Sequence, residues 1–371
     1  MNKQVFDSPD DINTVELRIR TVSGNLSPVI YANGRNQLPV EVIAKALKTD
    51  GVGKITILHF SDETWRKILS LRMAETDAVL CREGQSGWCF TDISNEYSLE
   101  VVNTEATRDP VSPALISESD EGATIVTMYI YTTEINMKRI AVSIDTPQGK
   151  HFTTADSPEG AEKSSVSVNA IETMQYIVDK LNVQTAAGLG HTTVPLKLYF
   201  GRANGLDTYP IKAYYDNIYI TIQHQYRHYF IHGYGNGKDY PYRIAAYWTN
   251  HDNQHMLVAN PENPASSQNR VGFQGKAFWY NFGDNLHYEA VYNLFQTFEY
   301  EENKSICWTH FCFEASEHWP LPDNLGLHVN DTGLQEFDCE SWFEFYDMYG
   351  NYGKFTIRYN RSNQKIEIFE R

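Results

Sequence analysis

Long apolar runs, an excess of basic charge and a regular set of cysteines are all missing from this 371-residue chain. No apolar stretch approaches the ~20 residues that a membrane-spanning helix needs, so we expect no membrane span. The first 30 residues lack the basic segment and apolar run of a secretory signal peptide. We therefore expect synthesis in the cytoplasm, with any release by a leader-independent route.

The charge balance argues against a nucleic-acid partner. Lys and Arg number 31 against 47 Asp and Glu, which gives a formal net charge of −16. A surface this acidic repels phosphate backbones and anionic membranes. We expect no nucleic-acid partner.

Motifs for metals and cofactors are scarce as well. Five cysteines, an odd number with irregular spacing, do not predict a disulfide framework. Cys307 and Cys312 lack a second pair downstream, so their spacing predicts no zinc site. The Gly-rich segment 233–239 has three residues between its first glycine and its Gly-Lys pair, where a phosphate-binding loop needs four. We predict neither a metal nor a cofactor.

Alternating apolar residues are the main structural signal. Val15, Leu17 and Ile19 alternate with charged residues, which predicts a half-buried strand. Such alternation recurs along the chain, with turn signals at intervals of ~8–12 residues. Ser61 followed by two acidic residues predicts the start of one short helix. We predict an all-β fold of two small immunoglobulin-like sandwiches and a larger, aromatic-rich sandwich of jelly-roll or lectin-like kind.

Two breaks in the alternation divide the predicted sandwiches. Residues 104–122 combine prolines with an acidic run and predict a linker. Residues 184–191 form a Gly/Ala-rich break. The predicted domains are 1–110, 111–222 and 223–371.

Aromatic side chains concentrate in the third predicted domain, which holds 32 of the 49 in the chain. We assign most of those on predicted strands, such as Trp342 and Phe345, to the core, because each buries a large area. Aromatic residues in predicted loops instead favour contact with an outside partner, since rings pack on sugars and dominate interface hot spots. The predicted ligand-binding residues are Tyr234, Asn236, Asp239, Tyr240, Tyr242, Trp248, Tyr349, Asn351 and Tyr352.

Three histidines, His224, His228 and His232, stand four residues apart. On a strand they would share one face with Tyr226 and Phe230, because side chains alternate with a period of two. Neighbouring members would lie ~13 Å apart along the strand, too far to share a metal ion. We expect partly buried histidines on an aromatic sheet face, with a weak pH response as the functional alternative.

Three carboxylates alternate along the string Glu-Phe-Asp-Cys-Glu at residues 336–340. This string resembles the catalytic strand of retaining β-glucanases of the laminarinase–lichenase family. The resemblance, which covers these five residues, implies that Glu336 is the nucleophile and Glu340 the acid/base. It also implies that Asp338 is an orienting carboxyl between them.

Together these patterns predict a non-enzymatic binding protein that engages a glycan or a protein surface through its tyrosine-rich loops. By analogy with other multi-sandwich proteins, the expected setting is a bacterial adhesin or toxin component. Two alternatives stay open. One is a self-assembling structural protein, a homo-oligomer whose subunit contacts use the same tyrosines, and the less favoured one is a glycosidase that uses Glu336 and Glu340.

Overall fold

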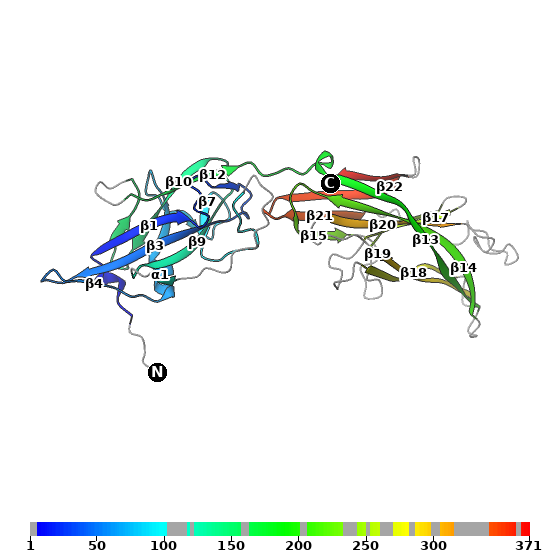
Figure 1. Ribbon diagram of the computed structural model, residues 1–371, viewed down its shortest axis with the longest axis horizontal. Helices are drawn as coiled ribbons and strands as arrows, with labels where there is room; N and C mark the ends of the chain where they lie inside the picture. Colours follow the sequence, from blue (N-terminus) through cyan, green and yellow to red (C-terminus); the bar gives the residue numbers. More distant parts are fainter. Residues whose placement is uncertain are drawn as a thin grey trace, which may run out of the picture. The chain divides into compact units, whose positions relative to one another are not determined.

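Strands make up nearly all the regular structure of the described residues, and the fold is all-β (Figure 1). The strands fall into two units. Unit 1 comprises Met1–Met174 with Met348–Asn351, and unit 2 comprises Gln175–Asp347 with Tyr352–Arg371. The computed structural model describes residues 6–101, 117–118, 122–156, 163–200, 206–232, 243–249, 253–259, 270–281, 286–297, 305–314, 341–360 and 365–371.

Unit 1 is built from two sheets. The first has the strand order β1-β3-β9-β7-β6, with β4 paired to β3 and β8 to β9, and the second has the order β11-β10-β12-β2, with β5 paired to β10. The elements are η1 Pro9–Asp11, β1 Thr14–Thr21, β2 Val29–Tyr31, β3 Leu38–Thr49, β4 Ile55–Ile57, α1 Asp62–Ile68, β5 Leu69–Met73, β6 Cys81–Arg82, β7 Trp88–Thr91, β8 Ser117–Glu118, β9 Thr124–Thr132, β10 Met137–Asp145, β11 His151–Thr153 and β12 Val166–Ile171.

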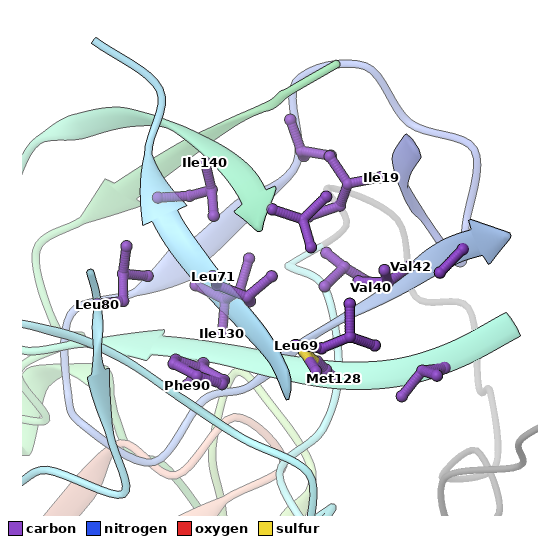
Figure 2. Close-up of a cluster of buried hydrophobic side chains, with 14 of the residues drawn as sticks. Ile19, Val40, Val42, Leu69, Leu71, Leu80, Phe90, Met128, Ile130 and Ile140 are labelled. Carbon is purple, nitrogen blue, oxygen red and sulfur yellow. The ribbon is translucent and has the colours of Figure 1, made fainter. Parts of the chain in front are cut away.

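The two sheets of unit 1 share one apolar core. Val40 of β3 and Ile130 of β9 come from the first sheet, and Leu71 of β5 and Ile140 of β10 come from the second. All four are fully buried, and Figure 2 shows their side chains gathered in a single cluster. Each buried side chain of this size contributes ~1.5–3 kcal/mol by leaving water. This shared core makes unit 1 a two-sheet sandwich.

The predicted alternation of β1 is confirmed. Leu17 and Ile19 are buried, while the charged residues between and beside them are exposed. β1 pairs antiparallel with β3 and places Leu17 opposite Ala44, which is also buried. The apolar rows of both strands therefore lie on the core face, as a period of two requires.

The helix α1 begins where the sequence predicts. The Ser61 hydroxyl accepts a hydrogen bond from the Thr64 backbone N–H at 3.2 Å, which satisfies one of the free donors of the first turn. The helix ends at Ile68, and β5 begins at Leu69. Trp65 is buried and packs edge-on against Phe60 with 5.0 Å between ring centroids. No helix of the described residues is long and apolar enough to cross a membrane.

The two units differ from the predicted domains. The predicted boundary at residue 110 separates β3 from β9, yet these strands pair from Leu38 opposite Ile130 to Ala44 opposite Thr124. β5 and β10 also pair across that boundary. The first unit therefore extends to Met174, and the second begins at Gln175 instead of residue 223. Alternation identifies strands and their buried faces, but it does not show which strands pair.

Unit 2 is also built from two sheets. Their strand orders are β16-β17-β20-β14-β13-β19-β18 and β15-β21-β22-β23. The elements are η2 Val178–Lys180, β13 Asn182–Phe200, β14 Leu206–Thr221, β15 Tyr226–His232, β16 Arg243–Thr249, β17 Asn253–Ala259, β18 Arg270–Asn281, β19 Leu286–Thr297, β20 Ser305–Glu314, β21 Ser341–Asp347, β22 Tyr352–Asn360 and β23 Lys365–Glu370.

The Gly/Ala-rich segment 184–191 does not separate two domains. It lies inside β13, which pairs with β14 on both sides of the segment. The register shifts between Ala186 and Gly190, so the small residues accommodate a local irregularity in a continuous strand.

Candidate binding surface

The sheet β15-β21-β22-β23 of unit 2 has one buried face and one accessible face. Phe343 and Phe345 of β21 are fully buried, whereas Trp342, Glu344 and Tyr346 are only half-buried. β22 alternates in the same way. Since successive side chains of a strand point to opposite faces, the half-buried set shares the accessible face.

Aromatic packing fixes the buried face. The ring centroid of Phe345 lies 4.9 Å from that of Tyr176, 5.0 Å from that of Tyr226 and 6.1 Å from that of Phe355. Gly353 stands opposite Phe345, and a Cβ at Gly353 would lie 2.4 Å from the Phe345 ring. A glycine is needed at this position because the ring occupies the space of a side chain.

The accessible face, which we call the aromatic face, spans all four strands. In register, Phe230 stands opposite Glu344, which in turn stands opposite Lys354. Three of its rings are widely exposed, Phe230 at 42%, Tyr352 at 40% and Phe369 at 37%. The aromatic face consists of Phe230, Trp342, Glu344, Tyr346, Tyr352, Lys354, Arg358 and Phe369.

Cations lie over two rings of the aromatic face. The Lys354 Nζ is 4.2 Å from the centroid of the Trp342 ring, and the Arg371 Cζ is 5.0 Å from it. The Arg358 Cζ is 4.2 Å from the centroid of the Phe369 ring. Each such contact contributes ~0.5–1 kcal/mol at an exposed site. The contacts gather positive charge on this face of a chain whose net charge is −16.

Tyr352 contacts both a carboxylate and a second ring of the aromatic face. Its hydroxyl donates to Glu344 Oε2 at 2.5 Å, and its ring lies 5.1 Å from that of Tyr346. Partial burial and the Glu344 carboxylate both raise the pKa of Tyr352 above its usual value. The hydroxyl therefore stays protonated near neutral pH and remains a hydrogen-bond donor.

The predicted ligand-binding residues are not gathered in one place. Tyr352 lies on the aromatic face, whereas Tyr349 and Asn351 belong to unit 1 and are buried. The Tyr349 ring packs 5.6 Å from that of Tyr31, and Asn33 donates to the side-chain oxygen of Asn351 at 3.1 Å. Tyr349 and Asn351 are therefore not part of the aromatic face. The other predicted residues lie outside the part of the chain whose side chains are described: Tyr234, Asn236, Asp239, Tyr240, Tyr242 and Trp248.

The predicted catalytic carboxylates Glu336, Asp338 and Glu340 also lie outside the described residues, so the glycosidase alternative stays a prediction. Within the described ranges, no group of three or more His, Cys, Asp and Glu side chains is placed to hold a metal ion.

The predicted histidine stripe is interrupted by a bulge. β15 begins at Tyr226, so His224 precedes the strand, and the register with β21 shifts between Tyr226 and His228. One extra residue in a strand moves the following side chains to the opposite face. Tyr226 is accordingly buried and Phe230 exposed. The prediction that these two rings share a face is wrong.

His224 predicts a pH dependence of stability. Burial lowers its pKa from 6.5, and the nearby Asp347 opposes this shift only in part. The unfolded chain then binds the proton more readily, so this contribution to stability is present above the unfolded pKa and is lost as the pH falls through the folded pKa.

We expect the melting temperature of the wild type to fall more than that of His224→Gln between about pH 7 and pH 5. Circular dichroism melts at constant ionic strength measure both proteins. Parallel pH profiles would show that His224 does not contribute.

Sequence reasoning missed part of the aromatic face. Phe230, Lys354 and Phe369 were not among the predicted binding residues, and Trp342, assigned to the core, lies half-buried on this face. Charge does not distinguish the two faces of β21, because Glu344 lies on the accessible face while Asp347 is fully buried on the other. Aromatic residues also lie on both faces of β21, so hydrophobicity does not distinguish them either.

Comparison with known proteins adds no constraint. No protein-family model, curated protein or solved structure matches the chain.

Proposed function

We propose that this chain is a non-enzymatic binding protein whose aromatic face contacts an outside partner. The observation that carries the proposal is the exposure of Phe230, Tyr352 and Phe369 on one face of one sheet. Clustered exposed apolar groups on a folded surface mark interaction sites. The interior packing of this sheet comes from the opposite face, where other rings surround Phe345.

The partner that we propose is a glycan. Tyr352 supplies an accessible ring, and Glu344 and Lys354, which stand opposite each other, supply a hydrogen-bond acceptor and a donor. An apolar platform with a few placed polar groups is typical of small-molecule sites. It matches a sugar, which presents a C–H face to a ring and hydroxyls to the polar groups.

The finer architecture is part of the same proposal. We propose a jelly-roll or lectin-like sandwich for the aromatic-rich part of the chain and immunoglobulin-like packing for the two sheets of unit 1. Two sheets in each unit, with mostly antiparallel pairing, support it. The corresponding role is that of a bacterial adhesin or toxin component.

Self-association through the aromatic face is the second candidate function. The face carries Glu344 opposite Lys354, so two copies related by a two-fold axis can exchange these charged contacts. Exposed aromatic residues also dominate the energy of protein interfaces. Under this alternative the chain is a structural protein that assembles through unit 2.

A glycan array tests the first candidate. The wild type is compared with Tyr352→Ala and with Phe6→Ala, which truncates a 46% exposed ring of unit 1 as a matched control. We expect Tyr352→Ala to weaken binding at least ~10-fold, which corresponds to about 1.4 kcal/mol. Phe6→Ala is expected to bind as the wild type does. Melting curves of the three proteins serve to check that each is folded.

Light scattering after size-exclusion chromatography tests the second candidate. An oligomer that dissociates in Phe230→Ala/Tyr352→Ala/Phe369→Ala, but not in Phe6→Ala, would support assembly through this face. A monomer that binds no glycan on the array would contradict both candidates.

A further inference from the structure

Two cysteines of unit 1 stand opposite each other on neighbouring strands. Cys81 of β6 pairs in parallel register with Cys89 of β7. Neighbouring strands lie ~4.8 Å apart, which is within the ~4.4–6.8 Å between Cα atoms that a disulfide spans. We infer that Cys81 and Cys89 form a redox-active dithiol, which closes to a disulfide by exchange with a low-molecular-weight disulfide of the glutathione type.

Both sulfurs converge on Gly84. A Cβ built on Gly84 would lie 2.4 Å from the Cys81 Sγ and 2.9 Å from the Cys89 Sγ. The two sulfurs therefore cannot be farther apart than the sum of these distances. Any larger residue at position 84 would collide with the pair. Both cysteines are free thiols in this structure.

The segment between the two cysteines is held around the sulfurs. The Tyr131 hydroxyl donates to the Gly84 carbonyl at 2.9 Å, and the Cys89 thiol donates to the Ser86 carbonyl at 3.2 Å. Glu83 has a φ of 56°, an uncommon conformation for a residue with a side chain. The backbone thus turns tightly to place Gly84 beside the thiols.

The two thiols differ in solvent exposure, which determines the order in which they react. Cys81 is exposed and Cys89 is buried. Burial, and then the neighbouring Cys81, raise the pKa of Cys89, so little of this thiol is thiolate near neutral pH. Cys81 is therefore the attacking thiol and Cys89 the resolving thiol.

The reaction is a pair of thiol–disulfide exchanges. The Cys81 thiolate attacks one sulfur of oxidised glutathione, forms a mixed disulfide and releases a glutathione thiolate. The Cys89 thiolate then attacks the Cys81 sulfur and releases the second glutathione thiolate. The protons of the two protein thiols end on the two glutathione molecules, so two protein thiols are oxidised and one glutathione disulfide is reduced.

The bond would fasten an edge of the sheet. β6 is the last strand in the order β1-β3-β9-β7-β6, and it pairs only with β7 among the described strands. In the reduced protein, Arg82 of β6 holds this edge through hydrogen bonds to the backbone oxygens of Arg66 and Leu69. Oxidation adds a covalent link at the same place and so makes the stability of this edge depend on redox conditions.

Mass spectrometry of the full chain tests the inference. The reference protein carries Cys307→Ser, Cys312→Ser and Cys339→Ser, so that only the proposed pair remains. After native incubation with oxidised glutathione and alkylation, we expect its mass to show the loss of two hydrogens and no label, reversed by dithiothreitol. Adding Cys89→Ser is expected to leave one lasting glutathione adduct on Cys81, and adding Cys81→Ser is expected to leave Cys89 unreacted.

A second measurement, a tryptic digest, uses the wild-type protein, so its result does not depend on whether a variant folds. Trypsin cuts after Arg82, between the two cysteines, so their disulfide appears as two joined peptides in a digest without reductant. In the reference protein, two thiols that stay fully alkylatable after oxidised glutathione, or a glutathione adduct that persists on Cys81 or Cys89, would overturn the inference. So would the lack of joined peptides in the oxidised wild type.

Discussion

Replacing Leu71 by alanine is expected to lower the free energy of unfolding of unit 1 by about 2–5 kcal/mol. Leu71 of β5 is 0% exposed and lies in the core that both sheets share. The substitution removes apolar contacts to each sheet and leaves a cavity, because densely packed strands relax only in part. Figure 2 shows Leu71 among core side chains from both sheets.

Leu26→Ala is the matched control, since the same atoms are removed from a side chain that is 88% exposed. We expect a change within about 0.5 kcal/mol for this variant. Urea unfolding measures both, and an unchanged dependence on urea would show that the midpoint shift reports stability. Equal losses for the two variants would contradict the assigned core.

Gly353→Ala is expected to destabilise unit 2 by about 1–3 kcal/mol or more. The new Cβ would lie 2.4 Å from the Phe345 ring. That ring is enclosed by those of Tyr176, Tyr226 and Phe355, so it has little room to move aside. Because Gly353 lies between Tyr352 and Lys354, the strain is also expected to weaken binding by the aromatic face.

Gly51→Ala controls for the general effect of adding a methyl group to a glycine. A Cβ at Gly51 has no heavy atom within 4 Å, and its φ lies outside the range that favours glycine. We expect this variant to be neutral or more stable by up to about 1 kcal/mol, because alanine restricts the unfolded chain. Denaturant unfolding compares the two variants, and a Gly353→Ala protein as stable as Gly51→Ala would refute the packing of Phe345.

Local features could be predicted from the sequence because their causes are local. The Ser61 cap depends on one side chain and a backbone donor three residues away. The buried row of Leu17 and Ile19 follows from alternation alone. β22 and β23, which are close in sequence, pair as far as Asn360 opposite Lys365.

Pairing between distant segments could not be predicted in the same way. The antiparallel ladder of β3 and β9 crosses the predicted domain boundary. The sequence of neither strand specifies which other strand it pairs with. The bulge after Tyr226 illustrates the same limit, because one unpaired residue reverses the faces of all that follow.

The amino-acid sequence by itself determined the all-β class, the position of the helix, the acidic surface and the residues able to form strands. Tertiary structure alone decided which face of β21 is buried. Trp342 and Tyr346 on one face and Phe343 and Phe345 on the other are all aromatic, so hydrophobicity does not distinguish the two sides. Tertiary contacts decide which face is buried, because the rings of Tyr176 and Tyr226 pack against Phe345 and the opposite face stays accessible.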